Sequence, residues 1–462
     1  MKHIASGLSC LRFSSLYMEV ILTLLRYEIK KLMKTVHVIS VIAGVICLIS
    51  CSKFNIVKDP ITVTSPTPDK QITKVTLSET QAGYVESGNK MAFRFLGEMF
   101  DGENIVCSPL SLQYALAMTA NGASGETLRE IIDFLGYGED GIEALNEYNK
   151  TLLEQLPAVD LDVTLKVTDA LLVNDRFPLL PEFKETVTNS YYAAVDNMDF
   201  SDPKEIAARI NEWARRSTDG FIDKVLSDQE ISDNAVAYIM NALYFKAKWN
   251  GSEYSPMFLE ELTKPADFHL SDGTIVKTDM MNNMRYHQYA EMDGYKVLVL
   301  PYAGGKFNMY VLLPDENDLQ GLIDKLQNTS WNDILGNLKQ DAEVYVKLPK
   351  FDIENKYDLS EALKSLGVEK AFMENGAEFD RMFARNDYYY WISKVIQKSR
   401  ISVSEWGTEA GSVTVVEMDA EASPGPGEEP KRVHFYADRP FVFIIGEETS
   451  GTILFEGVVT HP

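Results

Sequence analysis

Apolar residues recur at helical spacing through the early part of this chain, after its first hundred residues. Ser108 is a typical helix N-cap and Pro109 suits the first helical position, so residues 108–123 are predicted to form a helix. Residues 124–136 repeat the pattern and end on a glycine, a common helix stop. Residues 202–220 form a third amphipathic segment. Helices are therefore expected to open the folded part of the chain.

Apolar runs without helical spacing dominate the later part of the chain. Residues 306–315, 342–355, 440–448 and 451–459 are rich in β-branched and aromatic residues and are often apolar on both faces. That pattern is typical of central strands in a large sheet. Helices first and strands later predict an α+β domain built on a large sheet.

One stretch near the C-terminus breaks this regularity. Residues 405–433 begin with small and β-branched residues, as a strand does, and continue with Pro, Gly and acidic residues. The second half cannot pack into a core. The sequence therefore predicts a long exposed loop, over about residues 407–433, whose first half is strand-like.

The N-terminal region resembles an export signal. A charged start at Met33 leads into an apolar run that is short for a membrane span, and the run ends at Cys51. The tetrapeptide "LISC" resembles the lipobox of bacterial lipoproteins, in which the Cys is lipidated. A plain signal peptide or a membrane anchor is the alternative. We expect a signal over residues 1–50, with Met33 as an alternative start, and a lipidated Cys followed by a flexible tether over residues 51–78.

Composition narrows the possible partners and compartments. The 462-residue chain has a formal net charge of −24, so nucleic acid is an unexpected partner. Hydrophobic residues make up 45% of the chain, enough for a sizeable core. Processing at Cys51 would leave Cys107 as the one free thiol, within an apolar run that suits a core residue.

The sequence contains no recognisable catalytic or metal-binding pattern. The histidines after Cys51 are scattered, and none stands at metal-ligand spacing. A nucleophile elbow and a phosphate-binding loop are both missing. We therefore expect neither an enzyme nor a metal site, and no cofactor.

Five segments, in the same order, resemble the serpin family of serine protease inhibitors. They are residues 104–131, 211–226, 241–249, 348–372 and 435–445, the last of which carries the family's C-terminal signature from Asp438 to Phe441. The resemblance spans residues 79–462. It implies the serpin fold, with a large central sheet, further sheets, about eight or nine helices and an exposed reactive-centre loop.

The resemblance also implies a function. A target serine protease, or a cysteine protease as a further class, would cleave the loop and remain attached as an acyl-enzyme while the loop inserts into the main sheet. The alternative is a non-inhibitory serpin that acts as a substrate decoy, carrier or chaperone. The partner is then the protease, bound by a monomer, with no heparin expected because the early helices lack a basic cluster. The lipobox implies an exported protein of the cell envelope, on the periplasmic or the surface face, or an extracellular one.

Insertion requires small side chains at the start of the loop. The resemblance assigns the hinge to six residues: Gly407, Thr408, Glu409, Ala410, Gly411 and Ser412. A strand alternates its faces, and the set that begins at Thr408 is small or β-branched at every second position up to Val416. We predict that this set faces inward. Members that have lost inhibition tend to carry bulk, charge or Pro here, so the hinge favours an inhibitor.

Two further sites carry over from the family. Ser108, Ser111 and Asn241 match the shutter, where side-chain hydrogen bonds hold the main sheet together, and Trp249 ends the strand at the breach, where the loop first enters. The family usually has a His where this chain has Gln397. We expect Gln397 to donate to Asn241 and the shutter to have reduced pH sensitivity.

The bait bond is predicted by two counts that disagree. In serpins the residue before the cleaved bond usually stands at a fixed number of positions after the hinge, and in this chain that position is Glu421, so the cleaved bond would be Glu421–Ala422. Counting back from Pro440 by the family's usual spacing ends near Glu429 instead. We favour the hinge count, because it sets how far the protease is carried. A glutamyl-specific protease suits this bond, and an elastase-like enzyme suits the alternative bond Ala420–Glu421.

Overall fold

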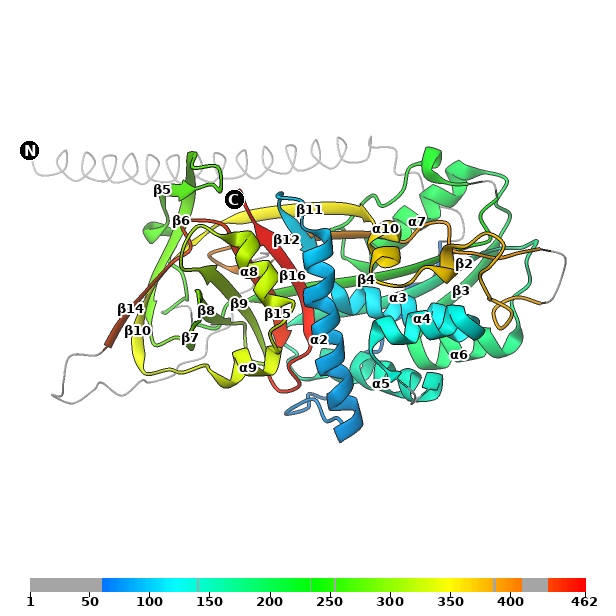
Figure 1. Cartoon of the computed structure of the whole chain (residues 1–462), viewed down its shortest axis with the longest axis horizontal. Coiled ribbons are helices and arrows are strands. Elements are labelled where there is room, and N and C mark those ends of the chain that lie inside the picture. The colour runs from blue at the N-terminus through cyan, green and yellow to red at the C-terminus, as the bar shows by residue number, and fades with distance from the viewer. Residues whose placement is uncertain (1–59, 139–140, 233, 253–254, 385–387, 409–430) are drawn as a thin grey trace, which may run out of the picture. The chain divides into compact units, whose positions relative to one another are not determined.

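The computed structural model describes residues 60–138, 141–232, 234–252, 255–384, 388–408 and 431–462. Within these residues the fold is α+β, as predicted, with nine α-helices and three β-sheets (Figure 1). The helices are α2 (Glu79–Met99), α3 (Pro109–Gly122), α4 (Gly125–Leu135), α5 (Gly141–Gln155), α6 (Pro181–Tyr191), α7 (Pro203–Ser217), α8 (Leu319–Leu326), α9 (Trp331–Gly336) and α10 (Ser360–Ser365). None of these described helices is long and apolar enough to cross a membrane.

The predicted helix signals are confirmed. Ser108 caps α3, because its side chain accepts a hydrogen bond from the Ser111 backbone N–H, and Pro109 takes the first position. Helix α4 ends at Gly136, whose φ of 77° lies in the left-handed region that favours glycine. Local sequence therefore set the start of α3 and the end of α4.

The first sheet, called the closed sheet, has the order β1-β16-β15-β9-β8-β7. Its strands are β1 (Ile105–Cys107), β7 (Tyr289–Met292), β8 (Tyr295–Pro301), β9 (Phe307–Pro314), β15 (Phe441–Glu447) and β16 (Ile453–Val459). Every residue of β9, β15 and β16 is buried, which confirms the prediction of strands that are apolar on both faces.

The second sheet, called the main sheet, has the order β11-β12-β13-β4-β2-β3. Its strands are β2 (Thr164–Asn174), β3 (Ala194–Met198), β4 (Ala237–Lys248), β11 (Phe351–Asp358), β12 (Ile396–Ser404) and β13 (Gly407–Thr408). The third sheet has the order β14-β10-β6-β5, from β5 (Lys264–His269), β6 (Ile275–Arg285), β10 (Ala342–Pro349) and β14 (Lys431–Tyr436). Figure 1 shows this third sheet at the opposite end of the fold from α4, α5 and α6.

The main sheet lies between two apolar layers. Leu172 of β2 packs in a cluster with Ile210 and Trp213 of α7, while its neighbour Leu171 belongs to the larger core. Alternate residues of a strand point to opposite faces, so α7 covers one face of the sheet. Helix α3 packs under the other face, against β4 and β2.

The segment predicted as a flexible tether is packed where the structure describes it. Ile61 is fully buried and belongs to the same cluster as Trp213 of α7. The Arg216 side chain donates a hydrogen bond to the Ile61 carbonyl oxygen at 3.1 Å. A buried side chain fixes the backbone around it, so the folded unit extends N-terminal to residue 79.

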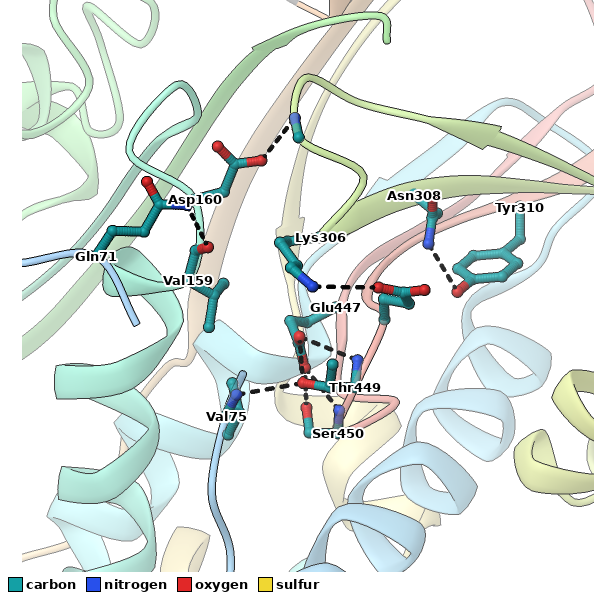
Figure 2. Close-up of polar contacts among 12 residues, drawn as sticks. Gln71, Val75, Val159, Asp160, Lys306, Asn308, Tyr310, Glu447, Thr449 and Ser450 are labelled. Carbon is teal, nitrogen blue, oxygen red and sulfur yellow. Dashed lines mark hydrogen bonds and ion pairs between the residues drawn. The ribbon is translucent and has the colours of Figure 1, made fainter. Parts of the chain in front are cut away.

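Polar contacts continue along this segment, which we call the N-terminal strap (residues 60–78). Figure 2 shows the Gln71 side chain donating to the Val159 carbonyl oxygen at 3.3 Å and the Val75 backbone N–H donating to the Thr449 hydroxyl at 3.2 Å. Thr449 belongs to the β15–β16 turn, which is ordered by hydrogen bonds to the Glu447 carboxylate. The strap is thus tied to two distant parts of the domain.

Candidate functional site

The first two hinge residues already form a strand inside the main sheet. Strand β12 ends at Ser404, and the chain turns back as β13, where Thr408 pairs with Val403 of β12 on one side and with Ala247 of β4 on the other. Gly407 has a φ of 138°, and a Cβ there would meet the carbonyl oxygen of Ala247. Glycine is therefore required at the point where the loop enters the sheet.

Aromatic residues support the hinge from below at the breach. Trp249 is buried and stacks on Tyr302, with ring centroids 4.6 Å apart and planes 8° from parallel. Its indole N–H donates to the Ser404 carbonyl oxygen at 2.8 Å, which ties the end of β4 to the end of β12. The Tyr302 and Thr408 hydroxyls share a hydrogen bond of 2.5 Å, and Thr408 is only 3% exposed. The structure thus places Thr408 facing inward, as the alternation predicts.

Below β13 the main sheet is open between β4 and β12. Among the described residues these two strands are joined only through the two-residue β13. A cavity of about 870 Å³, which we call the slot, lies along the gap. Its lining includes Tyr238 to Leu243 of β4, Ile396 to Ser399 of β12, Leu112, Ala115 and Leu116 of α3, and Ile210 and Trp213 of α7. Two strand edges facing each other across a cavity can accept one more strand.

The predicted shutter residues meet at the middle of the slot. The Ser111 hydroxyl donates to the Asn241 side-chain oxygen, and the Ser108 hydroxyl donates to the Leu454 carbonyl oxygen at 2.7 Å. Ser108, Ser111, Asn241 and Gln397 all line the slot. The structure therefore brings together all four residues that the sequence singled out.

The predicted bond between Gln397 and Asn241 is wrong. Gln397 instead accepts from the Ser108 backbone N–H at 3.1 Å and donates to the Ser108 carbonyl oxygen at 2.9 Å. Ser108 has a backbone N–H free for this bond because the first N–H groups of a helix lack partners within it. Strand β12 is thus held through the start of α3 rather than directly by β4.

Other predicted site residues lie outside the described part of the chain. They are Cys51, the hinge residues Glu409, Ala410, Gly411 and Ser412, and the bait-bond candidates Ala420, Glu421 and Ala422. Their roles stay predictions.

Family comparison agrees with this geometry. The model of the family described as "Serpin (serine protease inhibitor)" matches residues 86–462. The chain belongs to the serpin family. It is 31% identical to Serpin-Z10 of Arabidopsis thaliana over 82% of this chain and 98% of that protein. It is 33% identical to an uncharacterised serpin-like protein of Thermococcus kodakarensis, covering 82% and 85% of the two chains.

Solved serpin structures share the fold in two forms. The native-state structure of tengpin, a thermophilic serpin, covers 87% of this chain and all of its own with a TM-score of 0.74 at 27% identity. Cleaved Serpin 42Da covers 83% of this chain and 99% of its own with a TM-score of 0.73 at 26% identity. Serpins are generally protease inhibitors rather than enzymes, and some members are non-inhibitory.

Sequence reasoning missed one residue that contacts the predicted shutter. Asp169 of β2 stands opposite Asn241 of β4, and the Asn241 side-chain amide donates to its carboxyl at 2.7 Å. In the sequence it is a single acid before the apolar run "ALLV", and no motif marks it. The one available signal was the period of the strand, which turns Asp169 away from solvent together with Leu171.

Proposed function

We propose that this serpin inhibits serine endopeptidases, with cysteine endopeptidases as a further class, by suicide-substrate trapping. The protease nucleophile attacks the carbonyl carbon of Glu421. The bond to the Ala422 nitrogen breaks, and the amine leaves with the proton that the nucleophile gave up. The Glu421 carbonyl stays on the enzyme, as an ester of a serine or a thioester of a cysteine. The freed loop then enters the slot and carries the protease with it.

The observation that carries the proposal is the partly entered hinge. Thr408 is paired on both sides and buried, and directly beyond it the slot runs on between β4 and β12. A strand extended from Thr408 would pair with two edges at once. Each ladder hydrogen bond contributes about 0.5–1.5 kcal/mol net, so entry of the whole segment is strongly favourable. The uninserted state is then held by a kinetic barrier.

The register supports the choice of bait bond. Thr408 pairs with Ala247 and with Val403, so a loop continued in the same register by six residues would set Thr414 opposite both Asn241 and Gln397, the two sides of the shutter. The same pairing would set Met418 opposite Ala237, the first residue of β4, so Glu421, thirteen residues beyond Thr408, would lie just past the end of that strand, where Asn234 lines the slot. At ~3.3 Å per residue that travel is roughly 43 Å. Cleavage near Glu429 would place the bond eight residues further beyond the start of β4.

A protease panel tests the proposal. Purified residues 52–462 are incubated with a glutamyl-specific protease, an elastase-like protease and trypsin, and the products are resolved after boiling in detergent. We expect a covalent complex with at least one of the first two. A chain that is only clipped by every protease contradicts trapping and supports the substrate-decoy alternative.

Mass spectrometry of the C-terminal fragment released from the complex identifies the bond. A fragment that starts at Ala422 supports Glu421–Ala422, and one that starts at Glu421 supports the elastase-like alternative. A fragment that starts at Val433, after the Lys431–Arg432 pair, contradicts the count from the hinge.

For localisation, we propose an exported serpin attached to the cell envelope by a lipidated Cys51, as in bacterial lipoproteins. The support is the lipobox-like sequence that ends at Cys51. An acyl chain contributes about 0.8 kcal/mol of membrane affinity per buried CH₂. Cys51→Ala should therefore move the full chain from the membrane fraction to the soluble fraction, with Cys107→Ala as the control. A wild-type chain found wholly in the soluble fraction contradicts the anchor.

A further inference from the structure

The shutter contains a carboxyl group that is buried behind Asn241. Asp169 is 1% exposed, and its Oδ1 accepts the one hydrogen bond from the Asn241 amide. Its Oδ2 is buried and has no hydrogen-bond partner. An ionised carboxylate has room for several donors, so this one is far from satisfied.

The groups around Asp169 bring no positive charge. The titratable groups that feel the charge of Asp169 from the packed elements are Tyr114 of α3 and Tyr191 of α6, and Asn241 of β4 is its hydrogen-bond donor. Burial raises the pKa of both tyrosines well above their usual value, so both stay neutral. Burial likewise raises the pKa of Asp169 to about 7, against the lowering effect of the Asn241 bond. The carboxyl therefore changes charge within the neutral range while it is enclosed.

A continuous set of hydrogen bonds connects this carboxyl to the far side of the slot. From Asp169 it passes through the Asn241 amide to the hydroxyl of Ser111, whose backbone N–H bonds the Ser108 hydroxyl. From Ser108 it continues through both backbone groups to Gln397 of β12. Thr414 is the loop residue that the register would bring to this point, between Asn241 and Gln397. Loop entry would therefore act directly on Asn241, the residue that donates to Asp169.

We propose that Asp169 is the ionisable group of the shutter and makes opening of the main sheet depend on pH. Asp169 positions Asn241. When the Asp169 carboxyl is neutral, burying it in the closed arrangement costs little free energy. When it is ionised, the buried carboxylate has only one hydrogen-bond donor, and the closed arrangement is destabilised. Opening at Asn241 admits water to the carboxyl and relieves that charge. This role rests on the proposed function, because it assumes that the slot admits a strand.

The sign of the effect follows from the direction of the shift. The enclosed carboxyl holds its proton up to about pH 7, whereas a hydrated one releases it near its usual value of 3.8. Raising the pH toward 7 therefore favours the opened state, and above 7 the effect is constant. The entry rate should rise about tenfold for each unit by which opening lowers the pKa.

The test follows entry of a fluorescently labelled peptide with the sequence of residues 408–420, so no protease is needed. Its rate of incorporation into residues 52–462 is measured from pH 5.5 to 8.5. For the wild type we expect a rate that rises up to about pH 7 and then levels off. Asp169→Asn keeps an oxygen for the Asn241 amide and should give a flat profile. Asp169→Ser, which is smaller, should also flatten it if the asparagine variant does not fold.

Asp160→Asn is the matched control. Asp160 is buried and its pKa is raised, first by burial, but it accepts hydrogen bonds from the backbone N–H groups of Asp162 and Gly304, away from the shutter. This variant should keep the wild-type slope. If the entry rate of the wild type does not change with pH, or if Asp169→Asn keeps the wild-type pH dependence, the role of Asp169 is overturned and the proposed inhibition by loop insertion is not. A peptide that enters the wild type at no pH overturns the slot, and with it both proposals.

Discussion

The closed sheet and the main sheet have six strands each but differ at their centres. The central strands of the closed sheet pair along their whole length, as in β9 with β15, and are buried at every residue. The main sheet is interrupted, because only β13 separates β4 from β12 and the slot follows it. The closed sheet has apolar side chains such as Phe443 and Ile444 at its centre, whereas the shutter of the main sheet has the polar side chains of Asn241 and Ser111. In the closed sheet, paired strands and apolar packing stabilise the fold. In the main sheet, the gap between β4 and β12 and its polar side chains leave room for one more strand.

Each of these two sheets also buries one carboxyl group whose second oxygen has no hydrogen-bond partner. Glu456 of β16 is fully buried against the Cys107 thiol, at 3.7 Å, and its Oε2 has no partner. Asp169 is in the same state in the main sheet, but its donor Asn241 lines the slot. The same chemistry should therefore affect global stability in one sheet and strand entry in the other.

The largest effect should come from a charge on the inward face of the hinge. Thr408→Arg places a long cation where the Thr408 side chain is buried between two strands, and burying an unpaired charge costs several kcal/mol. We expect the yield of covalent complex to fall by about tenfold or more, with clipped chain in its place. Glu409→Arg, on the opposite alternation, is the control and should retain most of the complex. Equal yields from the two variants contradict insertion.

A cavity in the closed sheet should affect stability and leave trapping alone. Ile444 is fully buried and packed on both sides by paired strands. Ile444→Ala should lower the free energy of unfolding by about 2–5 kcal/mol. Urea unfolding measures the loss, and the ratio of complex to clipped chain should stay at the wild-type value. A changed ratio would show that the two sheets are not separable.

A smaller effect should appear as the pH dependence of stability. Burial raises the pKa of the Glu456 carboxyl well above the usual 4.5, against the lowering effect of the hydrogen bond from the Cys107 thiol. Its contribution to stability is fully present below pH 4.5 and is lost as the pH rises, at about 1.4 kcal/mol per unit, because the unfolded chain ionises first. Glu456→Gln should reduce the slope of the unfolding free energy against pH, measured in urea at pH 5, 6, 7 and 8, by this amount, while the contribution of Asp169 below pH 7 remains. The exposed Glu103→Gln should keep it, and a slope unchanged in Glu456→Gln contradicts the assignment.

The features of this serpin that could be predicted from the sequence are those set by interactions between residues close together in the chain. The cap at Ser108 needs only its own side chain and the N–H three residues on, and the buried strand β15 is visible as an unbroken apolar run. The inward face of the hinge followed from strand alternation, and Thr408 bears it out. Family resemblance then placed the shutter residues, since their order along the chain is enough to find them.

The tertiary structure decided the rest, because those features join residues that are far apart in the chain. Gln397 bonds Ser108 across 289 positions, and the Asn241–Asp169 bond spans 72. The sequence of the strap predicts a flexible tether, yet Ile61 is buried because it packs in the apolar cluster beside α7. The slot exists only between strands that the fold brings together, and Asp169 acquires its raised pKa only from the burial that the fold imposes. A pattern along the chain reports which residues can be buried, and only packing determines what each of them meets.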